Sequence, residues 1–170
     1  MESFYRRMRW LVAIILFVSV AACSDNTDLA NTVATKDSQV EKVTLDVYKS
    51  RTCLCCSKWV AHVKAFGFET NVHHPANLNK LKSDKGVSPR YQSCHTAVSK
   101  DGYVFEGHIP ADIIQRFLIN PPTNAIGLAV PGMPVGSPGM EMGNRHDEYD
   151  VFLLNKDGND VVYEHIGASD

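Results

Sequence analysis

The run Val43-Thr-Leu-Asp-Val-Tyr48 is followed four residues later by Cys53-Leu-Cys55-Cys56 and then by a run from Ser57 to Phe66. The first run alternates apolar and polar side chains, which predicts a β-strand, and the last has a helical pattern. The cysteines therefore lie where a strand ends and a helix begins. A thiolate there is stabilised by the helix dipole and by free backbone N–H groups, so the sequence predicts reactive, metal-binding thiols.

A second strand is expected over Phe68–His73, because this run alternates and lies between Gly67 and Pro75. A strand, a helix and a strand within about 30 residues form a right-handed βαβ unit. Sites in α/β sheets usually lie at the carboxyl ends of the strands, which is where the cysteines fall.

The rest of the pattern completes one α/β domain. Turn and stop signals predict a short helix over 77–85, a hairpin of 93–98 with 103–109, and a helix over 111–119. They also predict a buried strand over 127–130 and a second hairpin of 149–154 with 160–165. This order predicts a thioredoxin-like single domain with a central mixed sheet, flanking helices and a C-terminal hairpin. Gly132-Met133-Pro134 resembles the Gly-x-Pro of that fold, whose cis-proline faces the cysteine motif. We therefore expect Met133 beside Cys53 and Cys56.

The N-terminus has the features of a targeting segment. Three arginines precede an apolar run of 13 residues from Trp10 to Ala22, which is short of the roughly 20 residues that span a bilayer. Val20-Ala-Ala-Cys23 resembles a bacterial lipobox, in which Cys23 becomes the acylated first residue, and a plain secretory signal is the alternative. Ser24 after the cysteine indicates the outer membrane, with the domain facing the periplasm.

Three segments are expected: a lipoprotein signal peptide over 1–22, a polar flexible tether over 23–41, and the metal-binding domain over 42–170. Cleavage takes three arginines and one glutamate from 17 basic and 19 acidic residues, which leaves 14 and 18 and a net charge of −4. A nucleic-acid-binding protein needs a basic face, so the composition excludes that class.

Four cysteines remain once Cys23 is set aside: Cys53, Cys55, Cys56 and Cys94. Structural disulfides are the ordinary expectation in an oxidising compartment. Bridges between such close neighbours are strained relative to the usual Cα separation of about 5.5–6 Å, and Cys53 with Cys56 is the one comfortable local pair. We interpret all four thiols as metal ligands, with a free buried thiol as the alternative for Cys94.

Methionines supply a second group of sulfur donors. Beyond the signal segment they all lie in one glycine- and proline-rich stretch, as Met133, Met140 and Met142. Thiolate and thioether are soft ligands that together favour Cu(I) over zinc, iron or hard cations. Several thiolates exceed what one Cu(I) needs, so we expect a sulfur-bridged cluster of copper ions. Met133 and Met140 are the predicted thioether ligands, and ordinary apolar packing is the alternative.

Two histidines are predicted as nitrogen ligands. His108 lies at a break beside Gly107 that can aim its ring at the site, and Glu106 is a candidate acceptor that would orient this ring. His95 directly follows Cys94, so both can bind one ion only if the strand is irregular there. His146 is a further candidate. The other histidines are expected at the surface or at helix caps: His62, His73, His74 and His165.

Four separated motifs carry a family resemblance: Cys53-Leu-Cys55-Cys56 with Trp59, Cys94-His95-Thr96, Glu106-Gly107-His108-Ile109-Pro110, and Gly127 to Glu141. Together they resemble the periplasmic copper-resistance proteins called CopG, over roughly Val43 to His165. The resemblance implies a thioredoxin-like domain that binds copper through its cysteines and takes part in copper detoxification.

The sequence therefore predicts a lipid-anchored periplasmic protein that binds copper for sequestration, transfer or redox conversion, with other periplasmic copper-resistance proteins as possible partners. The alternative is a thiol–disulfide oxidoreductase, in which Cys53 and Cys56 attack and resolve a mixed disulfide. Cys55 and Cys94 argue against this alternative, because extra thiols beside the pair would scramble the exchange. A metal-binding protein is the first expectation, and copper redox or thiol–disulfide activity stays open.

Overall fold

The computed structural model describes residues 42–167. The predicted signal peptide, Cys23 and the tether lie outside the described residues. Among the helices that are described, none is long and apolar enough to cross a membrane.

Strands and helices follow the predicted order with shifts of a few residues at their ends. They are β1 (Thr44–Lys49), α2 (Leu54–Ala65), β2 (Glu69–His73), α3 (Leu78–Asp84), the 3₁₀ helix η2 (Pro89–Tyr91), β3 (His95–Ser99), β4 (Val104–Glu106), α4 (Ala111–Ile119), β5 (Ala125–Ala129), β6 (Tyr149–Asn155) and β7 (Val161–Ile166). The helix α2 begins at Leu54, within the cysteine motif, because Cys53 supplies the N-cap.

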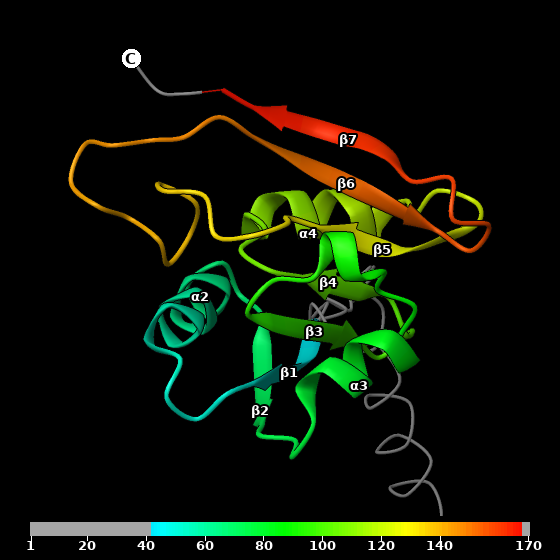
Figure 1. Ribbon diagram of the computed structural model, residues 1–170, viewed down its shortest axis with the longest axis horizontal. Coiled ribbons are helices and arrows are strands. Elements are labelled where there is room, and N and C mark those ends of the chain that lie inside the picture. The colour runs from blue at the N-terminus through cyan, green and yellow to red at the C-terminus, as the bar shows by residue number, and fades with distance from the viewer. Residues whose placement is uncertain (1–41, 168–170) are drawn as a thin grey trace, which may run out of the picture. The chain divides into compact units, whose positions relative to one another are not determined.

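The strands form one mixed sheet in the order β2-β1-β3-β4-β5-β6-β7 (Figure 1). β1 is parallel to β2 and antiparallel to β3, which is antiparallel to β4. This four-stranded half, with α2 between β1 and β2 and α4 after β4, has the thioredoxin-like arrangement. β5 extends the sheet parallel to β4, and the C-terminal hairpin of β6 and β7 closes it. The predicted α/β class, mixed sheet and terminal hairpin are confirmed.

Alternation along the strands gives the sheet two packed faces. Trp59 and Val63 of α2 and Ile114 and Phe117 of α4 share one apolar cluster with Phe105 of β4. A smaller cluster on other strand positions joins Val87, Tyr91, Val104, Ala129 and Leu154, and it lies in the region of α3 and η2. Since neighbouring residues of a strand point to opposite faces, the same strands serve both clusters.

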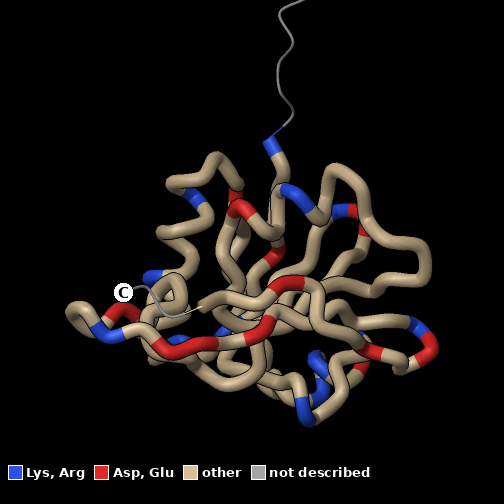
Figure 2. The backbone as a smooth tube through the Cα atoms, turned by 90° about the horizontal axis from the view of Figure 1, so that it is seen from above, with Lys and Arg blue, Asp and Glu red and all other residues tan. Residues whose placement is uncertain are grey.

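Charged residues of both signs occur along most of the described chain, but the stretch 117–140 contains none. In the view of Figure 2, Lys and Arg positions are interspersed with Asp and Glu positions. Two ion pairs with different partners hold the C-terminal hairpin: Arg90 Nη2 lies 3.2 Å from Asp160 Oδ2, and Arg116 Nη2 lies 2.7 Å from Glu164 Oε2.

The proposed analogy between Gly132-Met133-Pro134 and the cis-proline turn is wrong. Pro134 follows β5, and no peptide bond within residues 42–167 is cis. In a thioredoxin-like arrangement the turn that faces the cysteine motif is the one before β3, and here that turn contains Cys94. The fold thus places a thiol opposite the cysteine motif, at the position where the analogy had placed a proline.

Candidate metal centre

The cysteine motif forms the first turn of α2. Cys53 is the N-cap residue, and its Sγ accepts a hydrogen bond from the backbone N–H of Cys56 over 3.3 Å. Cys53 and Cys56 are joined by a disulfide, with their Cα atoms 5.5 Å apart. This is the local pair that the spacing permitted. Cys55 and Cys94 are free thiols.

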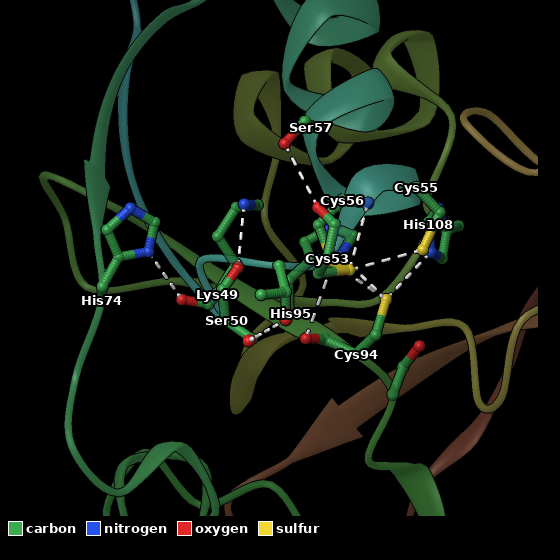
Figure 3. Close-up of a disulfide and its surroundings, with 12 residues drawn as sticks. Lys49, Ser50, Cys53, Cys55, Cys56, Ser57, His74, Cys94, His95 and His108 are labelled. Carbon is green, nitrogen blue, oxygen red and sulfur yellow. Dashed lines mark hydrogen bonds between the residues drawn. A yellow bond between two sulfur atoms is a disulfide. The ribbon is translucent and has the colours of Figure 1, made fainter.

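Cys94 lies in a bend directly before β3, and it completes a cluster of sulfur atoms (Figure 3). Its Sγ lies 3.3 Å from Cys56 Sγ, and Cys55 Sγ lies 3.4 Å from Cys53 Sγ. The four sulfur atoms all lie within 4.8 Å of one another. The fold therefore brings together the four cysteines that we predicted as ligands. Three come from the first turn of α2, and Cys94 comes from the bend before β3.

His108 lies in the turn after β4, and a backbone carbonyl orients its ring. Nδ1 lies 2.8 Å from the carbonyl oxygen of Pro138, and that oxygen can only accept, so Nδ1 carries a proton. In the neutral ring Nε2 then has the free lone pair, and it lies 3.0 Å from Cys94 Sγ. A ligand histidine usually donates its other N–H to such an acceptor. His108 is thus oriented as a metal ligand would be.

His95 begins β3 and is fully buried against α2, with its ring centroid 4.4 Å from that of Trp59. Its Nδ1 lies 3.4 Å from Cys94 Sγ, because Cys94 precedes the regular strand and can turn toward the same side. Cys94, His95 and His108 offer donor atoms within 4.8 Å of one another. Both predicted histidines therefore lie beside the sulfur cluster.

Burial controls the protonation of these groups. Burial, together with a smaller effect of the nearby Cys55, raises the pKa of the Cys94 thiol to about 12. Burial holds the pKa of His95 well below its usual value, with a smaller effect from the neighbouring His108. The pKa of His108 is also lowered by burial, although the hydrogen bond to Pro138 opposes this shift. Neutral imidazoles are ready to bind metal, whereas Cys94 must lose its proton when it does.

The segment of residues 131–147, which we call the strap, packs onto the centre. A Cβ on Gly139 would lie 2.7 Å from the carbonyl oxygen of Cys55 and 2.9 Å from the backbone nitrogen of Trp59. Ser93 Oγ donates a short hydrogen bond to the carbonyl oxygen of Gly132, at the start of the strap. Only a glycine at position 139 permits the strap to lie this close to α2. The same close packing places the carbonyl oxygen of the neighbouring Pro138 beside His108.

The strap also carries the methionines. Met140 is partly buried, whereas Met133 and Met142 are 52% and 54% exposed. Gly132, the neighbour of Met133, is bonded to Ser93, the neighbour of Cys94. Ligation by Met133 and Met140 stays a prediction.

The other histidines have different partners. His62 Nε2 accepts the backbone N–H of Ala111 and so caps α4. His73 and His165 pair with carboxylates at the surface, and His74 Nδ1 lies 2.9 Å from the carbonyl oxygen of Lys49. His146 is exposed. The prediction of surface and capping positions for the first four is confirmed.

The proposed role of Glu106 is wrong. Its carboxylate pairs with Lys82 and does not orient His108, whose partner is the Pro138 carbonyl. Sequence reasoning missed this carbonyl, which no side-chain pattern could have indicated. It also missed the burial of Lys82, which lies in the segment 77–85 that was predicted only as a short helix. A detectable signal was the acidic Glu106 directly after the apolar residues Val104 and Phe105 in a predicted strand.

The fold and this site define a class: a thioredoxin-like protein whose cysteine turn, opposing cysteine and two histidines form a candidate metal centre. A family model described as "Protein of unknown function, DUF411" matches residues 91–140. A search of curated proteins finds no match.

Two solved structures are similar over most of the chain. "Copper resistance protein copG- Form 2" is 41% identical with a TM-score of 0.71, and the match covers 75% of this chain and 100% of that one. "Copper resistance protein copG- Form 1" is 42% identical with a TM-score of 0.70, over 74% and 98%. The chain belongs to the CopG family of copper resistance proteins, as the resemblance of its motifs implied.

Proposed function

We propose that this chain is a lipid-anchored periplasmic protein that binds Cu(I) for copper resistance, by sequestration, transfer or redox conversion. The observation that carries the proposal is the convergence of four cysteine sulfurs within 4.8 Å of one another. Thiolates packed this closely repel one another, and a soft monovalent cation relieves the repulsion. The names of the related structures support copper as the metal.

The disulfide limits how much metal the site can bind until it is reduced. An external dithiol reductant that gives two electrons and two protons, and is itself oxidised to a disulfide, converts the Cys53–Cys56 bond into two thiols beside Cys55 and Cys94, which are already free. The four sulfurs then provide more donors than one Cu(I) requires, and bridging sulfurs would join several ions. His95 and His108 add nitrogen donors at the Cys94 side of the cluster.

Anaerobic titration with Cu(I), with and without prior reduction, tests this proposal. The reduced protein is expected to hold more than one Cu(I) per chain in competition with a chromophoric Cu(I) chelator. The disulfide form is expected to hold fewer, because two of its sulfurs are engaged. Saturation at one copper would leave a mononuclear site, and no tight binding by the reduced protein would refute the proposal.

The disulfide at the start of α2 favours a second candidate, a thiol–disulfide oxidoreductase. The neighbouring thiols argue against efficient turnover. Cys56 is fully buried, so a mixed disulfide with a substrate would form on Cys53, and the Sγ of Cys94 lies within 4.8 Å of Cys53 Sγ and can compete with Cys56 to resolve it. Insulin reduction separates the two functions, since the copper protein is expected to be slow in this assay.

A further inference from the structure

A buried ion pair lies on the side of β3 and β4 away from α2. The side chains of Lys82 and Glu106 are 1% and 0% exposed. Lys82 is the buried residue of α3, a helix whose other side chains are exposed or half-buried. Charged side chains are rarely buried to this degree, and an apolar pair of similar volume is often at least as stable. Stability alone therefore gives no reason for this pair.

The Glu106 carboxylate accepts hydrogen bonds from three directions. Lys82 Nζ and the backbone N–H of Ser93 both donate to Oε1, the latter over 2.6 Å. Thr96 Oγ1 donates to Oε2 over 2.6 Å and accepts from Lys82 Nζ over 3.1 Å. Lys82 thus fixes the position of the carboxylate, and the carboxylate fixes the backbone at Ser93.

This carboxylate connects the two turns that carry the Cys94 and His108 ligands. Ser93 directly precedes Cys94, and Glu106 is followed by Gly107 and His108. Cys94 and His108 lie just outside the strands β3 and β4, and the last backbone hydrogen bond between the two turns runs from the N–H of Gly107 to the carbonyl oxygen of His95 over 3.0 Å. The distance of 3.0 Å between Cys94 Sγ and His108 Nε2 therefore depends on the contacts that connect the two turns.

We propose that Glu106, held in place by Lys82, is a positioning residue that sets the spacing of Cys94 and His108 for copper. The inference rests on the proposed copper-binding function. In this inference, Glu106 accepts the hydrogen bond from the Ser93 N–H, and Lys82 holds the Glu106 carboxylate in place in an otherwise apolar layer. Neither residue touches the metal.

Two paired variants test the acceptor. Lys82→Met/Glu106→Leu removes the buried charges together with the acceptor, whereas Lys82→Met/Glu106→Gln removes the charges and retains an amide oxygen that can accept the Ser93 N–H. Lys80→Met is the matched control, because Lys80 lies on the same helix in an exposed pair with Asp84 at 2.7 Å. The Cu(I) affinity of the reduced full chain is measured by competition with the chromophoric chelator. The hydrogen exchange of the Ser93 amide is measured by NMR.

The leucine variant is expected to lose about tenfold to a hundredfold in Cu(I) affinity, the usual cost of losing an outer support of a metal site, and to lose protection of the Ser93 amide. The glutamine variant is expected to restore most of the Cu(I) affinity and most of the protection of the Ser93 amide. The Lys80→Met variant is expected to match the wild type in both measurements. If the leucine variant does not fold, Glu106→Asp replaces it, because it keeps both charges and withdraws the carboxylate by one methylene.

Equal Cu(I) affinity in the leucine and glutamine variants, with tight binding by the wild type, would overturn this inference and leave the proposed function intact. An equal loss in Lys80→Met would also overturn it. If the wild type itself binds no Cu(I), the proposed function is wrong and the inference fails with it.

Discussion

The Sγ atoms of Cys94 and Cys56 lie 3.3 Å apart, although 38 residues separate the two cysteines along the chain. One belongs to the first turn of α2 and the other to the bend before β3. Their contact depends on the antiparallel pairing of β1 with β3, which aligns Lys49 at the end of β1 with His95. The metal centre is therefore built where these two neighbouring strands meet the helix.

Cys94→Ser is expected to lower the number of Cu(I) ions held by the reduced chain and to weaken the rest, because Cys94 is the sulfur nearest both histidines. Anaerobic competition titration measures both effects. Ser57→Ala, on the same helical turn as the cysteine motif, is the control and should leave capacity unchanged. Unaltered capacity in Cys94→Ser would remove Cys94 from the ligand set.

Gly139→Ala is expected to destabilise the domain and to loosen the strap over the centre. The residue has a φ of 88°, and its added Cβ would meet backbone atoms of α2, which cannot move aside. Gly143→Ala is the control, because Gly143 also has a positive φ, of 60°, but has no atom within 4 Å of its Cβ position. Both variants bear the backbone cost, and overpacking should add about 1–3 kcal/mol to Gly139→Ala alone.

Urea denaturation measures this difference in the free energy of unfolding. Copper affinity should also fall in Gly139→Ala, since the neighbouring Pro138 carbonyl orients His108. Equal stability of the two alanine variants would show that the strap does not pack on α2 in solution.

The double variant Met133→Leu/Met140→Leu tests the thioether ligands. The exchange nearly preserves volume and costs less than about 1.5 kcal/mol of stability, so the fold should survive. A neutral soft thioether adds affinity for Cu(I) and little for zinc, so Cu(I) affinity or the copper potential should change while zinc affinity stays. Met142→Leu is the control. Unchanged copper affinity, potential and copper tolerance of cells would make these methionines packing residues.

Acid should destabilise the metal-free domain through its buried histidines. The pKa of His95 in the folded state lies below the unfolded value of about 6.5, so below that pH the unfolded chain binds a proton that the folded chain does not. The stabilisation is therefore present above pH 6.5 and is lost as the pH falls. One such histidine gives a slope of about 1.4 kcal/mol per pH unit.

Urea denaturation between pH 7 and pH 5 measures this slope, to which the lowered pKa values of His62 and His108 also contribute. His95→Phe keeps the aromatic packing against Trp59 and should reduce the slope by one histidine's share. His146→Asn, at an exposed position, should not. Identical slopes in these two variants would contradict the argument.

The predicted lipid anchor has a separate test. Cys23→Ala should release the protein from membranes without changing copper binding, because a predicted tether of 18 residues, Ser24 to Glu41, follows the predicted anchor in the sequence. Fractionation and copper titration of the same preparation check both halves of the expectation. A variant that stays in the membrane pellet would refute the lipoprotein assignment.

Local patterns were sufficient for most of the fold and for the chemical class of the site. Strand alternation, the Asp-Gly turns and the proline stops predicted the elements, because each depends on residues a few positions apart. The cysteine spacing predicted the thiol turn at the start of α2 and named Cys53 and Cys56 as the comfortable pair. The break at Gly107 indicated that the His108 ring can point toward the cysteine site, and its Nε2 lies 3.0 Å from Cys94 Sγ.

Tertiary structure decided which distant groups meet. The strand order placed Cys94 rather than Pro134 opposite the cysteine turn, and the strap brought the carbonyl of Pro138 to His108. Burial of Lys82 against Glu106 likewise depends on how α3 covers the sheet. These contacts join residues 24 to 38 positions apart, and some of them involve backbone atoms, which every residue has. Such contacts therefore cannot be predicted from the pattern of side-chain types, because they form only when the chain is folded and packed.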